Sequence, residues 1–173
     1  MSNVSRDKTL IVEPINAEGF SLFGTLINAT EDGVPFGRDD AELELSQGIP
    51  RFYIMELGPR PHRVVQITRH RRVTQVLAAV GGKAWIIVVA PPCSDQSDLA
   101  KPDFSKMRAF EVPGDAAIKL HVGAWHAGPY FEGNQAKFFN LELSDTNIVD
   151  HHSWNLEDCL GYTPVLSSAS TSP

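Results

Sequence analysis

The chain is poor in cysteine and has no long apolar run. Its two cysteines, Cys93 and Cys159, lie far apart and in no spacing typical of a metal site, so we expect reduced thiols. The N-terminal stretch 1–8 is polar and lacks the apolar segment of a secretory signal. The longest apolar run, residues 85–92, is far shorter than the ~20 residues that span a bilayer. These absences predict a cytoplasmic protein that binds no membrane.

An excess of positive charge is also missing. The 173 residues include 15 Lys and Arg against 21 Asp and Glu, which gives a formal net charge of −6. The densest basic stretch, residues 69–72, is interrupted by His70 and is too short to bind nucleic acid through its charge. The sequence also lacks a phosphate-binding glycine loop, a nucleophile elbow and a Cys–His pair. We therefore expect a small-molecule substrate or ligand and no nucleic acid.

The composition is that of a folded globular protein, with 42% apolar and 21% charged residues. The length suits one hydrophobic core, so we predict a single domain over residues 1–173. Its core is expected from about 9 to 160, with flexible ends at 1–7 and 167–173. Asn16 can cap a short helix over residues 17–23. The acidic, turn-rich stretch 28–47 is expected to form a loop or lid.

After Pro50 the alternation of apolar and polar residues indicates β-strands. Short strands separated by turn signals are typical of a sandwich or barrel, not of βαβ units. The pair Gly81-Gly82 is expected to form a hairpin turn. The expected strands are 9–12, 25–27, 51–57, 64–68, 73–80, 85–90, 107–112, 116–122 and 137–143, with a turn of helix at 154–160.

Two histidines lie close together in the segment 118–131, which reads I-K-L-H-V-G-A-W-H-A-G-P-Y-F. His121 and His126 are five residues apart, which is the wrong spacing for one helix face. A β-bulge or corner at Gly123 could instead turn both imidazoles to one side of a sheet. The alternative is that one of them is a surface or core histidine whose ring is satisfied by a backbone carbonyl.

A second imidazole-bearing segment lies upstream. It resembles the first motif of the cupin superfamily, H-x-H-x4-E-x6-G, whose four positions fall on Thr68, His70, Gln75 and Gly82. The segment 121–126 resembles the second motif, P-x-G-x-x-H, with His121 in place of the proline and His126 on the last metal-ligand position. The resemblance implies an all-β fold: a cupin-like double-stranded β-helix, or jelly-roll barrel, with a short N-terminal helix.

Within that superfamily the chain resembles the ureidoglycolate lyase family, also called ureidoglycolate hydrolases, of allantoin degradation in purine metabolism. The likeness runs from about residue 10 to about residue 150. Three departures stand out: Thr68 where the family has a glutamate, Tyr53 where it has a histidine, and Arg71 where it has a proline. The matching segments are Arg-His-x4-Gln at 69–75, Gly-x-Trp-His at 123–126, Ile-Val-Val-Ala-Pro at 87–91 and Pro-Ile-x4-Phe-x2-Phe-Gly at 14–24.

The resemblance implies a carbon–nitrogen lyase that releases urea and glyoxylate from a small hydroxy acid, and it implies a homodimer. Histidines suit this reaction because their ordinary pKa lies near neutrality. The candidate catalytic residues are His70, His121 and His126. Candidate substrate-binding residues are Arg69, Gln75, Trp125, Arg51 and Tyr53, with Arg69 or Arg51 expected to clamp the substrate carboxylate through paired hydrogen bonds.

The sequence leaves the cofactor and the exact substrate open. A divalent metal prefers three or more strong ligands, and the candidates are only His70, Gln75 and His126, joined by His121 if its strand is bulged. We therefore expect no cofactor other than a weakly bound divalent metal. The departures at Thr68 and Tyr53 leave two alternatives: a pocket retargeted to an isomerase, cyclase or dehydratase reaction, or a cupin that binds without catalysis. His151-His152 is expected to be an exposed pair and not a ligand pair. Glu142 could reach the pocket rim, although an acidic strand end is usually solvated.

Overall fold

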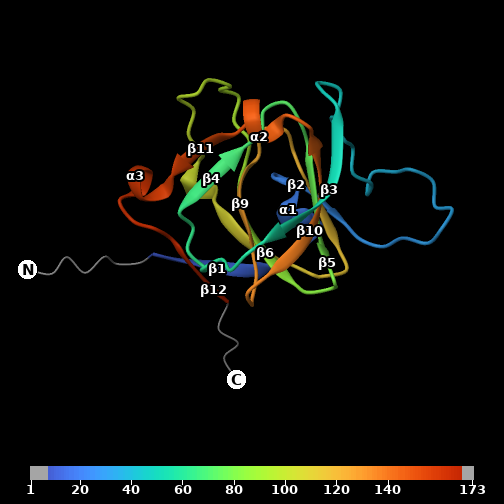
Figure 1. Cartoon of the computed structure of the whole chain (residues 1–173), viewed down its shortest axis with the longest axis horizontal. Coiled ribbons are helices and arrows are strands. Elements are labelled where there is room, and N and C mark those ends of the chain that lie inside the picture. The colour runs from blue at the N-terminus through green and yellow to red at the C-terminus, as the bar shows by residue number, and fades with distance from the viewer. Residues whose placement is uncertain (1–7, 169–173) are drawn as a thin grey trace, which may run out of the picture.

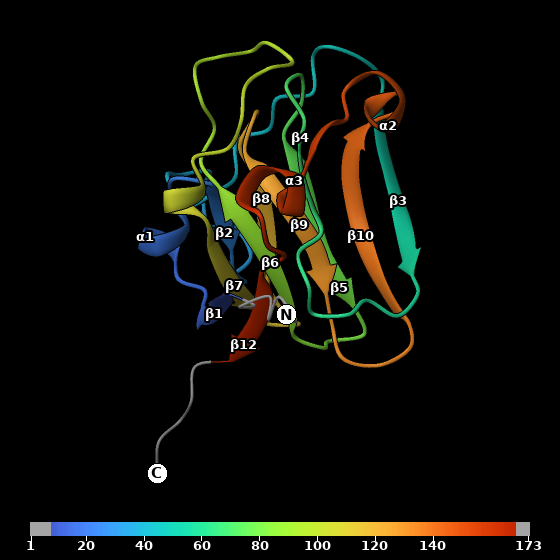
Figure 2. The same cartoon turned by 90° about the vertical axis from the view of Figure 1, so that its left-hand side faces the viewer.

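The computed structural model describes residues 8–168, most of them in or between β-strands. Two sheets curl around a shared core and form the all-β, cupin-like barrel that the motifs predict (Figures 1 and 2). The expected flexible stretch 1–7 and residues 169–173 of the expected C-terminal tail lie outside the described residues. Within 8–168, no helix has the length and hydropathy needed to cross a membrane.

The larger sheet has seven strands in the order β11-β4-β9-β6-β7-β1-β12, and the smaller has five in the order β2-β8-β5-β10-β3. β1 runs parallel to its neighbours β7 and β12, and the other pairs are antiparallel. The bounds in the larger sheet are β1 Thr9–Pro14, β4 Gln66–Arg69, β6 Trp85–Ala90, β7 Arg108–Val112, β9 Trp125–Tyr130, β11 His152–Asn155 and β12 Val165–Ser168. Those in the smaller are β2 Gly24–Ile27, β3 Pro50–Leu57, β5 Gln75–Val80, β8 Ala117–Leu120 and β10 Ala136–Leu143.

The helices are short and lie at the edges of the barrel. α1, Ala17–Phe20, begins where expected, because the Asn16 side chain accepts a hydrogen bond from the backbone N–H of Gly19 at 2.8 Å. The others are the 3₁₀ turn η1 (Phe104–Lys106), α2 (Thr146–Val149) and α3 (Leu156–Leu160), the last within the expected helical turn. The stretch 28–47 contains no helix or strand and projects from the barrel (Figure 1), as its turn residues predict.

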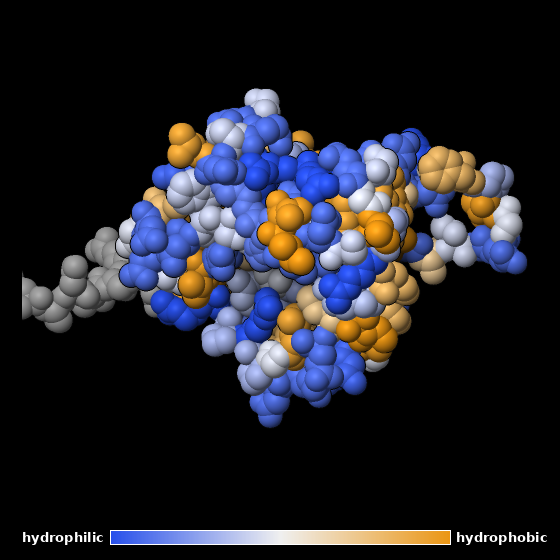
Figure 3. Space-filling model, turned by 45° about the horizontal axis from the view of Figure 1, so that its top comes forward, coloured by the Kyte–Doolittle hydropathy of each residue, from blue (hydrophilic) through white to orange (hydrophobic). Residues whose placement is uncertain are grey.

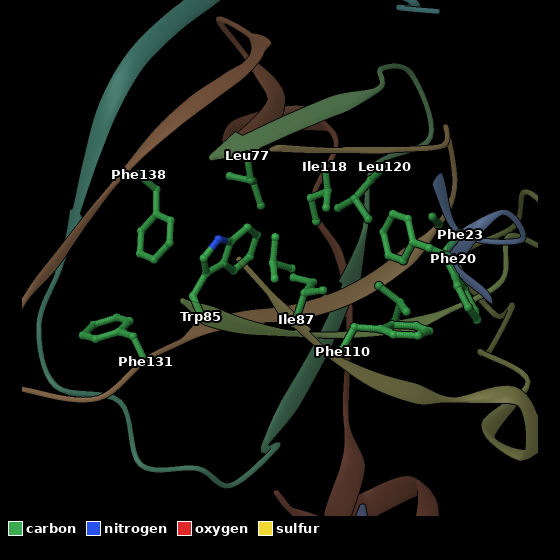
Figure 4. Packing of buried hydrophobic residues seen from close by; sticks show 13 residues of the cluster. Phe20, Phe23, Leu77, Trp85, Ile87, Phe110, Ile118, Leu120, Phe131 and Phe138 are labelled. Atoms are coloured by element: carbon green, nitrogen blue, oxygen red, sulfur yellow. The ribbon is translucent and has the colours of Figure 1, made fainter. Parts of the chain in front are cut away.

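The apolar run of β6 is explained by burial on both faces of the larger sheet. Trp85, Ile87 and Val89 pack into the core between the two sheets, part of which is drawn in Figure 4. The alternate residues of the strand pack into a second cluster that contains Trp125 and Leu156. All six residues of β6 are buried, so the strand carries no polar side chain.

Two expectations are wrong: that Gly81-Gly82 forms a hairpin turn, and that the core ends near residue 160. β5 lies in the smaller sheet and β6 in the larger, so the turn at Gly81-Gly82, with φ of 97° and 78°, carries the chain between sheets and forms no hairpin. Glycines of positive φ indicate a reversal, but not which strands pair after it. The core also continues past residue 160, because β12 pairs with β1 and buries Leu166.

Candidate functional site

A cavity of about 430 Å³ is lined by residues from both sheets. β4 and β9 supply the wall from the larger sheet, and β3, β5 and β10 supply the wall from the smaller one. The turn between β3 and β4 and the segment after β10 complete the lining. A volume of this size is within the ~300–1,000 Å³ range of small-molecule sites.

The structure brings His70 and His126 together in this cavity. His126, on β9, is preceded by Trp125 and pairs across the ladder with Thr68 of β4, two residues before His70. The two imidazole rings lie with their centroids 5.0 Å apart and their planes inclined by 54°. Side chains two residues apart on a strand share a face, so pairing at Thr68 places the two rings in the same pocket.

Backbone carbonyls determine the tautomers of both rings. His70 Nδ1 lies 2.6 Å from the carbonyl oxygen of Asp150, and His126 Nδ1 lies 3.2 Å from that of Ala124. A carbonyl can only accept, so each Nδ1 carries the proton and each Nε2 keeps a lone pair. Burial lowers the pKa of His70, and burial together with the neighbouring His70 lowers the pKa of His126 to about 3. At neutral pH the pocket therefore holds two uncharged imidazoles with unprotonated Nε2 atoms.

A buried carboxylate, Glu142, lies across the cavity on β10 and is 1% exposed. It accepts hydrogen bonds from Tyr53 Oη at 3.2 Å, Gln75 Nε2 at 3.1 Å and Asn147 Nδ2 at 3.0 Å. Burial, followed by the negative charge of Glu142, raises the pKa of Tyr53, which keeps the phenol protonated. Of the two alternatives for Glu142, the solvated strand end is wrong, and the residue lines the pocket. The alternation along β10 was the signal that could have revealed it, because Asn140 and Glu142 share the inward face.

The side-chain amide of Gln75 is held in one orientation. Its Nε2 donates to Asn140 Oδ1 at 3.2 Å and to Glu142 Oε2 at 3.1 Å, and neither acceptor could pair with the Gln75 carbonyl. Its Oε1 is buried and has no hydrogen-bond partner among the described residues. Gln75 therefore adds a third acceptor lone pair to those of His70 and His126.

These three lone pairs are of a kind that binds divalent metals, but they are few. Among residues 8–168, no group of three or more His, Cys, Asp and Glu side chains is arranged to hold a metal ion. The predicted set consists of two neutral imidazoles and one amide oxygen, without an anionic ligand. Such a donor set fits a weakly held ion, because tight divalent sites add carboxylates, thiolates or further imidazoles.

Arg69 and Trp125, predicted to bind substrate, lie on the opposite face of the larger sheet. Arg69 is fully buried, donates to the carbonyls of Asp95 and Ser97 at 2.9 Å each, and places its guanidinium 4.7 Å from the Trp125 ring centroid. Neighbouring residues on a strand point to opposite faces of the sheet. Because His70 and His126 point into the cavity, the adjacent Arg69 and Trp125 point away from it. The substrate-binding prediction for this pair is wrong. Arg69 instead holds the 91–98 loop.

His121 and Arg51 also lie outside the cavity lining. The His121 ring donates from Nε2 to the carbonyl of Ser21 and accepts from Lys119 Nζ at Nδ1, both at 3.0 Å. Gly123, with φ of 80°, forms the predicted corner, but this corner sends β8 and β9 into different sheets and separates His121 from His126. The Arg51 guanidinium lies 3.6 Å from the centroid of the Tyr53 ring. The structure therefore does not bring the predicted catalytic His121 or the predicted substrate-binding Arg51 into the cavity lining.

Three cationic or titratable residues of the cavity were missed. Arg60 and Arg63 reach it from the turn between β3 and β4, where no sequence motif marks them. His151 lines it as well, with its ring centroid 5.9 Å from that of His70 and its Nε2 3.4 Å from Thr68 Oγ1. The pair His151-His152 thus divides between the two faces of the sheet, since His152 contacts Arg69.

Acidification from pH 6.5 to pH 5 is expected to lower the free energy of unfolding. The unfolded chain binds a proton at His126 near the ordinary pKa of 6.5, whereas the folded chain binds it only near pH 3. The unfolded state thus carries more protons in this window, and each such histidine costs up to about 1.4 kcal/mol per pH unit. Urea unfolding at several pH values measures the slope. A His126→Asn slope equal to that of the unmodified chain would contradict this assignment.

Comparison with known proteins gives one family. Residues 39–164 match the family model described as ureidoglycolate lyase. A ureidoglycolate lyase of Burkholderia mallei (strain NCTC 10229) is 30% identical over 155 residues, covering 83% of this chain and 82% of the relative. The ureidoglycolate lyase of Saccharomyces cerevisiae is 25% identical over 154 residues, covering 69% and 76%. That of Escherichia coli (strain K12 / DH10B) is 25% identical over 155 residues, covering 83% and 93%.

Proposed function

The chain belongs to the ureidoglycolate lyase family, an enzyme family, and we propose that its pocket cleaves the carbon–nitrogen bond of a ureidoglycolate-like hydroxy acid, releasing urea and glyoxylate. One observation carries the proposal. His70 comes from the first cupin motif and His126 from the second, and their rings meet in the cavity. Each ring presents an unprotonated Nε2. A reaction that moves one proton between two substrate atoms needs such a group.

The proton transfers follow from the tautomers. In the first, an Nε2 lone pair takes the hydroxyl proton of the substrate, the C–O bond becomes a carbonyl, and the C–N bonding pair leaves with the ureido nitrogen. That nitrogen then needs a proton. Neither neutral ring has one on Nε2, so the imidazolium formed in the first transfer is the acid that returns it. The proton balance of the reaction is zero, and the lowered pKa of His126 favours rapid return.

The substrate carboxylate is assigned to the arginines of the pocket. Arg60 and Arg63 line the cavity on the side of the β3–β4 turn, and a guanidinium binds a carboxylate through two parallel hydrogen bonds. Glu142 lies elsewhere in the lining, with its two oxygens occupied by neutral donors. The positive arginines would attract the substrate carboxylate and the negative Glu142 would repel it, so a hydroxy acid would bind with its carboxylate away from Glu142.

The test is release of urea and glyoxylate from ureidoglycolate by the purified protein. Absence of release above background would refute the proposal.

A retargeted substrate is the second candidate function, and the departure at Thr68 favours it. Thr68 replaces the family glutamate; it lies beside His151 and contacts Ser153 Oγ at 2.6 Å. Thr68→Glu separates the two: lyase activity rises if ureidoglycolate is the substrate, and does not change if the substrate is another small acid.

Divalent metal is expected to bind weakly at His70, Gln75 and His126. A bound ion would polarise the substrate hydroxyl and favour its deprotonation. Elemental analysis after dialysis against chelator is expected to show far less than one metal per chain, because the set lacks an anionic ligand. Gln75→Glu is the matched variant, since it supplies that anion and should raise the metal content. One tightly held ion per unmodified chain would contradict the expectation.

The family resemblance also implies a homodimer, and β3 is a suitable surface for it. This strand is an edge of the smaller sheet, and its outward Phe52 and Ile54 are 67% and 54% exposed. Phe139 of β10 stacks on Phe52 with ring centroids 5.7 Å apart. Hydrophobic patches gather on the side of the molecule from which the stretch 28–47 projects (Figure 3). Exposed apolar edge strands are sites of association.

Sedimentation at micromolar concentration is expected to give a dimer. Ile54→Lys should shift the chain to monomer, because burying a charge at an edge-strand interface is costly. Leu22→Lys is the control, since Leu22 is 61% exposed but lies between α1 and β2, and β2 is the edge of the smaller sheet opposite β3. A monomeric unmodified chain would rule out the dimer, and a dimer unchanged by Ile54→Lys would rule out this surface.

A further inference from the structure

We propose that a second cavity, of about 500 Å³, binds a small organic anion with an apolar body. It is formed by the corner between β5 and β6, the loop between β9 and β10 and the start of β10. No residue that lines it also lines the cavity of His70 and His126. Its volume is within the ~300–1,000 Å³ range of small-molecule sites and is similar to that of the first cavity.

Three buried aromatic rings form the inner wall of this second cavity. Trp85, Phe131 and Phe138 are 1%, 6% and 1% exposed. Trp85 meets Phe138 with ring centroids 5.2 Å apart, and Phe131 lies 6.0 Å from Phe138 (Figure 4). Rings this large and this well packed would offer a rigid apolar surface. The body of the ligand is therefore apolar, and an aromatic ring would suit the edges and faces of the wall.

One polar atom in this wall lacks a partner. The indole Nε1 of Trp85 is buried and has no hydrogen-bond acceptor among the described residues. Figure 4 places this nitrogen on the side of the indole that faces Phe138, the neighbouring wall residue. Buried indole N–H groups usually find an acceptor, because leaving one unmatched costs free energy. The nitrogen itself has almost no accessible surface, so it belongs to the buried wall and offers no donor to a ligand in the cavity.

The charge at the rim selects the sign of the ligand. Lys83 and Lys137 line the cavity, and Lys83 forms no ion pair with any residue of the described chain. Lys137 lies 3.5 Å from Glu56, an exposed pair that contributes little and can yield to a ligand. The one acidic lining residue, Glu132, is 94% exposed and lies 3.8 Å from His62. A carboxylate or sulfonate would thus find two cations at the rim.

The first experiment is a fluorescence titration with 8-anilinonaphthalene-1-sulfonate, an apolar anion. Saturable binding at one site per chain is expected. Lys83→Glu reverses a rim charge and should weaken binding about fivefold. Lys83 is exposed, so this variant should fold normally and any loss of binding reports on the rim charge.

Competition identifies the ligand chemistry and separates the two cavities. 4-Phenylbutyrate should displace the dye, whereas the neutral 4-phenyl-1-butanol should do so at least about fivefold less well. Ureidoglycolate should not displace it, and His126→Ala should bind it normally. Equal displacement by acid and alcohol, affinity unchanged in Lys83→Glu, or loss of dye binding in His126→Ala would each overturn the proposal, whatever the outcome of the lyase assay.

Discussion

Replacing His126 with alanine is expected to lower kcat/KM for ureidoglycolate by about 10²-fold or more, which corresponds to about 2.7 kcal/mol of transition-state stabilisation. The ring supplies one of two unprotonated Nε2 atoms in the cavity, held by the hydrogen bond from Nδ1 to Ala124. Its neighbour, His70, is oriented by Asp150 and cannot move into the vacated position without losing that bond. The measurement is the rate of glyoxylate release at saturating and at low substrate.

His121→Ala is the matched control for this prediction. Both residues belong to the second motif and both are partly buried, but His121 contacts Ser21 and Lys119 outside the cavity. Its removal should change kcat/KM less than about threefold, since only local contacts are lost. Equal losses in the two variants would show that the effect comes from stability. Activity unaffected by His126→Ala would place the chemistry elsewhere.

Replacing Glu142 with alanine is expected to lower the free energy of unfolding by about 3 kcal/mol or more. The carboxylate accepts from Tyr53, Gln75 and the exposed Asn147, and its removal leaves the Tyr53 hydroxyl and one N–H of Gln75 without an acceptor in the wall. Each buried donor left unmatched costs about 1–3 kcal/mol, of which water entering the cavity would recover part. Urea unfolding with a constant m-value measures the loss.

Two variants make this stability prediction specific. Glu142→Gln keeps the shape and one acceptor, so its loss should lie between zero and that of Glu142→Ala. Glu56→Ala removes a carboxylate that is 55% exposed and paired only with Lys137, and it should cost less than about 1 kcal/mol. If Glu142→Ala costs no more than Glu56→Ala, the hydrogen-bond network around Glu142 contributes little to folding.

The residue pattern by itself determined the architecture and the central pair of the site. Strand alternation and turn signals located most strands, because side-chain direction along a strand has a period of two. The two motifs located His70, Gln75 and His126, and the structure places all three in one cavity. They were accessible to sequence analysis because their positions depend on short segments whose register follows from local spacing.

Tertiary structure decided which neighbours of that pair share the pocket. Arg69 and Trp125 are adjacent to the histidines in sequence, but the pleat turns them to the opposite face. His121 is separated from His126 because the chain changes sheet at Gly123. Conversely, Glu142, Arg60 and Arg63 come from distant segments and meet the histidines only where the two sheets close. Sheet membership depends on which strands pair over long range, and one-dimensional spacing does not carry that information.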